Sequence, residues 1–317
     1  MADTVSGQPP AEFARIAESW QPAATTASGR VQEWQVAAFA ALIGADAPGT
    51  DEPLPLLWHE TQLRDTPGLA DLGPDGHPAA GLLPPLSQRR RMFGGGTVDV
   101  IEALRVGERA SRVGRVVDRR LREGRAGWLL LVTEEYEWRG ADGEVRVRDR
   151  RDLVYRAPSD IAAAAASGPS TAAKAAESKA AEPKAAEPAP SGRWTLTMDT
   201  DERLLFMYSA LTYNTHRIHY DAPYAGAEEG YPGLLVQGPL IATGCAEVAR
   251  RHLGPVTSMT YRLVAPSFCG APLTFHAAEP VDGVSEVWAV QHDKICARGT
   301  ARVAASDESS AGKGSHA

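Results

Sequence analysis

The chain has 317 residues, of which 43% are hydrophobic and 23% are charged. These values are typical of globular proteins, and the length predicts one large domain or two of ordinary size. The formal net charge of −7 argues against nucleic acid as the main partner. The sequence shows neither an apolar run long enough to span a membrane nor a signal peptide, so we expect a cytoplasmic protein without membrane contact.

The first part of the chain predicts a helix followed by strands. Residues 31–43 place apolar side chains three or four positions apart and are followed by Gly44, which predicts an amphipathic helix. Further on, a short apolar run from Trp128 predicts a strand. Two more strand segments are predicted at 144–148 and 152–156, where polar and apolar residues alternate.

Two stretches have an unusual composition. Residues 94–96 are all glycine but lack the spacing of a phosphate-binding loop, so they predict a turn or a close approach of backbones. Lys-Ala-Ala-Glu units begin at Lys174, Lys179 and Lys184, in a tract that cannot bury enough apolar surface to fold. The predicted divisions are a first domain at 1–160, a disordered linker at 161–192, a second domain at 193–305 and a disordered tail at 306–317.

The second part predicts a sheet wrapped around one helix. Residues 239–252 are small and apolar on nearly all sides, carry basic residues at the end and are followed by Gly254 and Pro255, so we expect a buried helix. In the last strand, alternation places Ala297 on one face and Cys296 on the other. Further elements are predicted as a strand at 194–198, a helix at 202–211 and strands at 256–264, 273–278, 284–292 and 294–303. This order favours an α+β layer, and the strands of the first half suggest a second copy of it.

The three cysteines, Cys245, Cys269 and Cys296, lie in apolar or strand-like contexts without Cys-x-x-Cys spacing. We interpret them as reduced packing residues, and the sequence predicts no metal site.

Chemistry is concentrated in residues 208–224, which are dense in His, Asn, Arg, Asp and Tyr. An imidazole such as His219 can take a proton from a water that a neighbouring amide such as Asn214 holds. Gly238 precedes the buried helix, whose first amides have no partner within the helix and can bind a negative oxygen. Adding water to an unsaturated thioester requires a base and an oxyanion site of this kind.

Structural interpretations of the same residues remain open. A histidine in a turn is more often a hydrogen-bonded structural residue, and we interpret His216 in that way. Arg217 is more often a salt-bridging residue than a substrate clamp, and Asp221 can be the cap of a turn. Spacing alone leaves the catalytic interpretation of Asn214 and His219 undecided.

Residues 208–224 resemble the hydratase motif of MaoC-like hotdog enzymes, in particular the branch of hydroxyacyl-thioester dehydratase type 2 and mesaconyl-CoA hydratase. Residues 235–240 and 261–273 resemble later blocks of that branch, and residues 82–96 resemble its N-terminal domain. The resemblance implies a tandem double hotdog, each an antiparallel sheet wrapped around a central helix. The second would be catalytic, and the first non-catalytic but part of the acyl pocket.

The resemblance also implies roles for individual residues. His219 matches the catalytic histidine, Gly238 matches the glycine whose N–H faces the thioester oxygen, and Asn214 stands where most of these hydratases have aspartate. It implies neither a metal nor a redox cofactor, since coenzyme A is part of the substrate. The candidate substrate-binding residues are Arg217, Tyr213, Gln237, Arg91 and Arg262.

The expected function is reversible addition of water to an α,β-unsaturated acyl-CoA, such as mesaconyl-CoA or itaconyl-CoA, by an enzyme of the hydro-lyase class. One alternative is a 3-hydroxyacyl carrier-protein dehydratase, and another is a non-catalytic hotdog protein that binds acyl thioesters. A thioesterase is a weaker alternative, for which Asp221 or Glu247 would have to supply a carboxylate. Two hotdogs in one chain predict a monomeric pseudo-dimer or a homodimer.

Overall fold

The computed structural model describes residues 8–87, 91–124, 127–156 and 192–304. Its strands are β1 Thr25–Arg30, β2 Arg91–Val100, β3 Arg109–Gly124, β4 Gly127–Gly140, β5 Val145–Arg156, β6 Trp194–Met198, β7 Val256–Leu263, β8 Leu273–Ala277, β9 Val284–Gln291 and β10 Lys294–Val303. Its α-helices are α1 Ala11–Ser19, α2 Glu33–Leu42, α5 Glu202–Thr212, α6 Ala222–Ala227 and α7 Gly238–Leu253, and its 3-10 turns are η1 Trp58–Thr61, η2 Leu69–Asp71 and η3 Arg217–His219. The predicted linker lies outside the described residues except for Gly192, and the tail at 306–317 lies wholly outside them.

All ten strands form one antiparallel sheet in the order β1-β3-β4-β5-β2-β7-β10-β9-β8-β6. The two halves of the chain join where β2 pairs with β7. A Cβ on Gly95 would lie 2.2 Å from the Tyr261 carbonyl oxygen, and one on Gly96 would lie 2.3 Å from the Arg150 carbonyl oxygen. The predicted close approach of backbones at residues 94–96 is therefore confirmed, and it is the junction between the halves.

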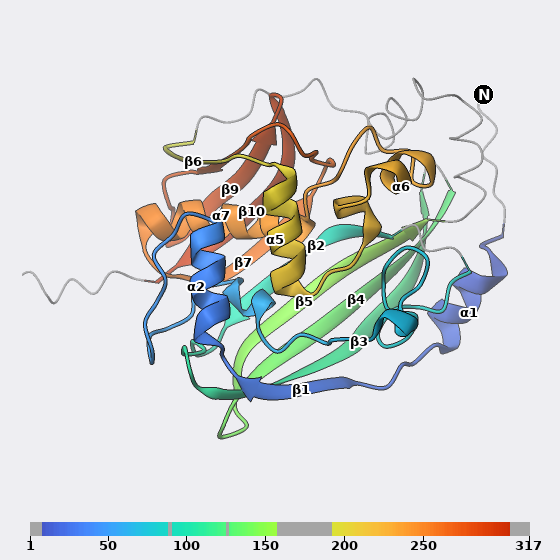
Figure 1. The fold of residues 1–317 in the computed structure, drawn as a ribbon, viewed down its shortest axis with the longest axis horizontal. Helices are drawn as coiled ribbons and strands as arrows, with labels where there is room; N and C mark the ends of the chain where they lie inside the picture. Colours follow the sequence, from blue (N-terminus) through green and yellow to red (C-terminus); the bar gives the residue numbers. More distant parts are fainter. Residues whose placement is uncertain (1–7, 88–90, 125–126, 157–191, 305–317) are drawn as a thin grey trace, which may run out of the picture.

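In the second half, β6 to β10 curve around α7, which packs against all five strands (Figure 1). The predicted buried helix is confirmed and begins one residue earlier than expected, at Gly238. Its buried side chains are small or aliphatic, such as Leu240, Ala242 and Val248. Gly244 brings the helix so close to β8 that a Cβ there would lie 2.2 Å from the ring of Phe275. The apolar surface removed from water by this packing stabilises the second half.

In the first half, α2 packs mainly against α5 and η1, and Figure 1 shows α2 and α5 side by side. The inner face of β4 and β5 is instead covered by the segment around η1, in which Trp58, His59 and Glu60 are all buried. The two halves therefore share a curved sheet but differ in what that sheet encloses.

Two local predictions differ from the structure. β5 is one strand from Val145 to Arg156 and not two segments. In β10, a bulge between Ile295 and Ala297 shifts the register against β9, so that Cys296 and Ala297 are both buried. The predicted strict alternation is therefore interrupted at Cys296 by the bulge.

The packing interpretation of the cysteines is confirmed, since Cys245 and Cys296 are free and buried and Cys269 is free and half-buried. Burial raises the pKa of the Cys245 thiol. Among the residues that the structure describes, no helix is long and apolar enough to cross a membrane.

Candidate active site

The motif begins where α5 ends. Asp201 caps the start of this helix by accepting a hydrogen bond from the Leu204 amide at 2.9 Å. At the other end, Tyr213 adopts a left-handed conformation with φ of +52°, which turns the chain toward Asn214. The Oδ1 of Asn214 then accepts from the His216 amide at 3.1 Å. This turn engages the oxygen of the Asn214 side chain, so its NH2 group is the part that can donate to a ligand.

His219 is held as a neutral base. Its Nδ1 donates to the Leu235 carbonyl oxygen at 2.8 Å, which fixes the proton on Nδ1 and leaves the lone pair on Nε2. The side chain is only 8% exposed. Burial lowers the pKa of His219 to about 4; the Arg91 charge also lowers it, and the hydrogen bond to Leu235 opposes the change.

The start of α7 lies close to this imidazole. The Leu235 amide donates to the Ile218 carbonyl oxygen at 3.0 Å, so the segment before α7 is fixed against η3. Gly238 follows Leu235 by three residues, and three residues span at most about 10 Å. The residue that His219 contacts is therefore joined to the first amide of α7 by at most about 10 Å of backbone.

Gly238 also has a packing reason to be glycine. A Cβ at this position would lie 2.5 Å from Leu263 Cδ1 and 3.0 Å from Phe93 Cδ1. These side chains come from β7 and β2, so both halves of the sheet meet at the start of α7.

Gln237, Tyr213 and Arg262 were candidate substrate-binding residues, and among the described residues none of them forms a hydrogen bond or ring contact with His219. Gln237 is fully buried, and its Nε2 donates to Leu205 O and Ser209 Oγ, each at 2.9 Å, which ties the start of α7 to α5. Tyr213 is 46% exposed, and its hydroxyl lies 3.5 Å from the Pro67 carbonyl oxygen. Arg262 is exposed on β7.

Arg217 forms structural contacts. Its Nε and Nη2 donate to Asp221 Oδ2 at 2.9 and 2.8 Å, and its Nη1 donates to the Pro74 carbonyl oxygen at 3.0 Å. The guanidinium also stacks over the ring of Tyr224 at 4.0 Å. Asp221 caps α6 by accepting from the Tyr224 amide at 3.0 Å. The salt-bridging interpretation of Arg217 and the cap interpretation of Asp221 are thus confirmed.

Glu247 is equally engaged. It is buried in α7, accepts from Trp58 Nε1 at 3.0 Å and pairs with Arg250 at 2.8 Å and with Arg251 at 3.1 Å. With Asp221 and Glu247 both tied into structural pairs, neither carboxylate is free for the thioesterase alternative.

A loop of the first half covers the motif, and sequence reasoning missed it. Gly76 has φ of +86°, and a Cβ there would lie 1.9 Å from the Thr215 carbonyl oxygen, so only glycine permits this contact. The Thr215 hydroxyl donates to Gly76 O, and the Arg217 amide donates to Asp75 O at 3.0 Å. The sequence feature that could have indicated this loop is the turn sequence Pro74-Asp75-Gly76, directly before His77.

The rings of three histidines lie close together at this contact. The ring of His77 lies 4.0 Å from that of His216, which lies 5.5 Å from that of His219. His77 Nδ1 is 3.1 Å from Asp75 Oδ2, and Arg91 donates to His77 Nε2. Burial and the neighbouring His77 hold the pKa of His216 well below its usual value, which agrees with its interpretation as a structural residue.

Among the described residues, one group has the composition of a metal site. His59, Glu60 and Asp149 are buried with ligand atoms within 4.8 Å of one another. Arg151, however, lies 2.8 Å from Glu60 and 2.7 Å from Asp149, so a guanidinium already provides the positive charge there. The donor set thus fits an internal ion pair better than a metal ion.

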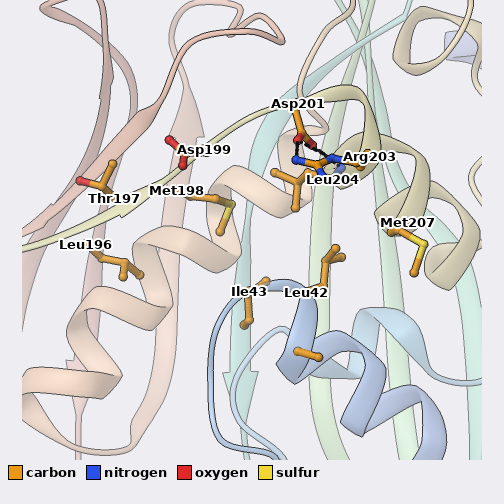
Figure 2. A pocket seen from close by; sticks show the side chains of 11 residues that line it. Leu42, Ile43, Leu196, Thr197, Met198, Asp199, Asp201, Arg203, Leu204 and Met207 are labelled. Carbon is orange, nitrogen blue, oxygen red and sulfur yellow. Dashed lines mark hydrogen bonds and ion pairs between the residues drawn. The ribbon is translucent and has the colours of Figure 1, made fainter.

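A separate hollow of about 480 Å³ lies at the end of α2, along β6 and at the start of α5. Figure 2 shows Leu42, Met198 and Leu204 on its walls, with the ion pair of Asp201 and Arg203 at its rim. Its lining includes neither Asn214 nor His219.

Comparison with solved structures defines the fold. The chain superposes on a MaoC-like dehydratase from Phytophthora capsici with a TM-score of 0.62 and 14% identity, covering 92% of this chain and 98% of that one. HtdX of Mycobacterium tuberculosis gives a TM-score of 0.59 and 17% identity, covering 89% of this chain and 100% of that one. The expected α+β double hotdog of the MaoC-like class is confirmed.

Sequence comparison defines the family. A family model for hydroxyacyl-thioester dehydratase type 2 matches residues 58–269. A mesaconyl-C(4)-CoA hydratase of Chloroflexus aurantiacus is 39% identical over 228 residues, which are 71% of this chain and 75% of the relative. The mitochondrial hydroxyacyl-thioester dehydratase type 2 of Schizosaccharomyces pombe is 34% identical over 94 residues, 28% of this chain and 31% of the relative.

The chain belongs to the hydroxyacyl-thioester dehydratase type 2 family. It is an acyl-thioester hydratase or dehydratase, and the expected hydro-lyase class is confirmed.

Proposed function

We propose that this enzyme adds water reversibly to an α,β-unsaturated acyl-CoA whose acyl group carries a second carboxylate, as that of mesaconyl-C(4)-CoA does. The product is the 3-hydroxyacyl-CoA. The relative named for that substrate matches 71% of the chain, which favours coenzyme A over a carrier protein as the thiol. One observation carries the proposal: the hydrogen bond from His219 Nδ1 to Leu235 O, which joins a neutral imidazole to the segment that leads into α7.

In the proposed mechanism, the Asn214 NH2 group holds a water, and His219 Nε2 removes one of its protons as the oxygen attacks Cβ. Electrons move from the C=C bond to the thioester oxygen, which accepts a hydrogen bond from the Gly238 amide. The proton on Nε2 then passes to Cα, so that the elements of one water are added and the imidazole is regenerated. An amide cannot accept a proton, so His219 performs both transfers.

The proposed reaction uses no metal and no redox cofactor, because the base and the backbone amide supply both kinds of assistance that the chemistry needs. The continuous sheet already pairs the two hotdogs within one chain. We therefore propose that a single chain forms a complete active site, as a pseudo-dimer.

The test is turnover on a panel of thioesters. The wild type should hydrate mesaconyl-C(4)-CoA or crotonyl-CoA faster than the corresponding carrier-protein thioesters. The His219→Ala variant should bind the same thioesters and lose at least ~100-fold in rate, the low end for a general base. Equal rates in wild type and variant would contradict the mechanism, and a preference for carrier-protein thioesters would support the dehydratase of fatty-acid or polyketide synthesis instead.

A further inference from the structure

Arg91 lies on the inner face of the sheet beside the proposed site. It is the first residue of β2 and pairs across the ladder with Tyr155, which is fully buried. Phe93 follows two residues later, so it shares a face with Arg91, and its ring approaches Gly238. Two residues of strand advance about 7 Å. A guanidinium at position 91 therefore reaches the same space as the start of α7.

The partner of Arg91 is a neutral group. Its guanidinium donates to His77 Nε2, while His77 Nδ1 faces Asp75 Oδ2 at 3.1 Å. An imidazole that accepts at Nε2 carries its proton on Nδ1, so Asp75 holds His77 in the tautomer that receives Arg91. Within the parts of the chain that the structure describes, Arg91 forms no direct ion pair, although its charge acts on the buried Glu134: burial raises the pKa of that carboxyl group and Arg91 lowers it.

Other arginines of this structure have carboxylate partners. Arg112 is paired with Asp65, Arg151 with Asp149, and Arg217 with Asp221. Among the described residues, Arg91 hydrogen-bonds to a neutral ring and to no carboxylate, so its desolvation is compensated only in part, by the nearby Glu134. The site thus suits an incoming anion. The positive charge also lowers the pKa of His219 and of His216, so Arg91 lies near enough to the base to act on it electrostatically.

We infer that Arg91 binds the free carboxylate of a dicarboxylic acyl thioester, and that Asp75 and His77 position it for this purpose. The inference rests on the proposed hydratase function and deepens it, since it assigns substrate selection to the first half of the chain. The carboxylate is bonded to Cβ of the acyl group, the carbon that the water attacks, and not to the thioester end. An anion could also come from the phosphates of coenzyme A, so the test must hold coenzyme A constant.

The experiment compares Arg91→Met with wild type on two CoA thioesters. The substrates are mesaconyl-C(4)-CoA and 3-methylcrotonyl-CoA, in which a methyl group replaces the free carboxylate. Loss of a charge-assisted contact should lower kcat/KM for the first by about 100-fold and leave the second within about threefold. Retained turnover of the neutral substrate also shows that the variant is folded. Arg150→Met, on the outer face of β5, is the matched control and should change neither rate.

The positioning role has its own variants. His77→Gln keeps an acceptor for Arg91 and should keep the preference for the charged substrate. His77→Leu removes that acceptor and should lose most of this preference, while its kcat on 3-methylcrotonyl-CoA should change little. Arg91→Lys should show a smaller selective loss, and it tests the inference if the methionine variant does not fold.

The outcomes separate the two proposals. An equal loss on both substrates would overturn the inference, because Arg91 would then act on coenzyme A or on His219. A wild type that hydrates crotonyl-CoA but gains nothing from the carboxylate would also overturn it, while the proposed function would stand. A folded wild type that hydrates none of these thioesters would contradict the proposed function, and the inference that rests on it.

Discussion

β6 to β10 enclose an apolar helix, whereas β4 and β5 of the same sheet face a layer of buried charges. In α7, the inward residues are aliphatic or small, and Gly244 lets the helix touch Phe275. The corresponding layer of the first half holds His59, Glu60, Asp149 and Arg151, all buried. The enclosed layer of the second half is therefore apolar, whereas the first half adds to its own apolar core, which includes Trp138 and Val147, a set of compensated ions that apolar side chains could replace at little or no cost.

This difference suggests a division of work. The apolar half presents a rigid helix whose first amide is fixed in space, which a site for a developing negative oxygen requires. The charged half brings Arg91 and the Asp75–His77 pair to the same place.

The largest effect is expected at the base in the second half. His219→Ala should lower kcat by 10²- to 10⁴-fold, the range for loss of a general base. His252→Ala is a suitable control, since His252 is exposed at the end of α7 and stacks on Trp194. Initial rates of the two variants on one enoyl-CoA measure both effects. Similar losses of rate in the two variants would contradict the role of His219 as the general base.

The next effect tests the charged layer of the first half. Arg151→Met should cost about 3–5 kcal/mol in the free energy of unfolding, because it leaves Glu60 and Asp149 buried without their cation. Replacing all three residues by apolar ones should recover most of that loss. Urea unfolding followed by fluorescence gives both values. A mild Arg151→Met variant would show that the layer is hydrated and not a compensated ion cluster.

A smaller loss is expected in the apolar half. Gly244→Ala should cost about 1–3 kcal/mol, because the added methyl group meets the ring of Phe275 at 2.2 Å. Gly226→Ala is the matched control: its nearest contact is the Tyr231 carbonyl oxygen at 3.8 Å, and alanine favours helix. The two thermal unfolding midpoints should therefore move in opposite directions or differ by several degrees. Equal midpoints would mean that α7 is packed less tightly than the structure shows.

The last effects concern pH and appear only in acid. The pKa of His219 is lowered to about 4, so kcat/KM should stay level below neutrality and fall only as the pH approaches 4. The unfolded chain has a histidine pKa near 6.5 and binds a proton first as the pH falls. Wild type should thus lose up to about 3 kcal/mol of stability between about pH 6.5 and pH 4, relative to His219→Gln. A pH–rate profile with its acid limb near 6.5 would contradict the buried, neutral state of this imidazole.

Much of the second half could be predicted because its pattern is local. The helix at 239–252 and the strand at 194–198 agree with α7 and β6 within a residue, since apolar periodicity and helix stop signals specify them. The interruption at Cys296 was not predicted because a bulge depends on the pairing with β9, which periodicity does not show.

The first half was harder to interpret for a physical reason. In β5, the buried positions 149 and 151 are occupied by the charged residues Asp149 and Arg151. Polar and apolar residues therefore do not alternate in the middle of this strand, and it was predicted as two segments. Asp75 and His77 escaped notice as site residues because they reach His216 only through tertiary contact, across more than a hundred residues of sequence. The motif around His219 was identified because its residues are close in sequence.

The most direct test of the account is a crystal structure of the His219→Gln variant with a bound 3-hydroxyacyl-CoA. The thioester oxygen should accept a hydrogen bond from the Gly238 amide, and the 3-hydroxyl group should lie between residues 214 and 219. A thioester bound elsewhere, such as in the hollow between α2, β6 and α5, would contradict it (Figure 2).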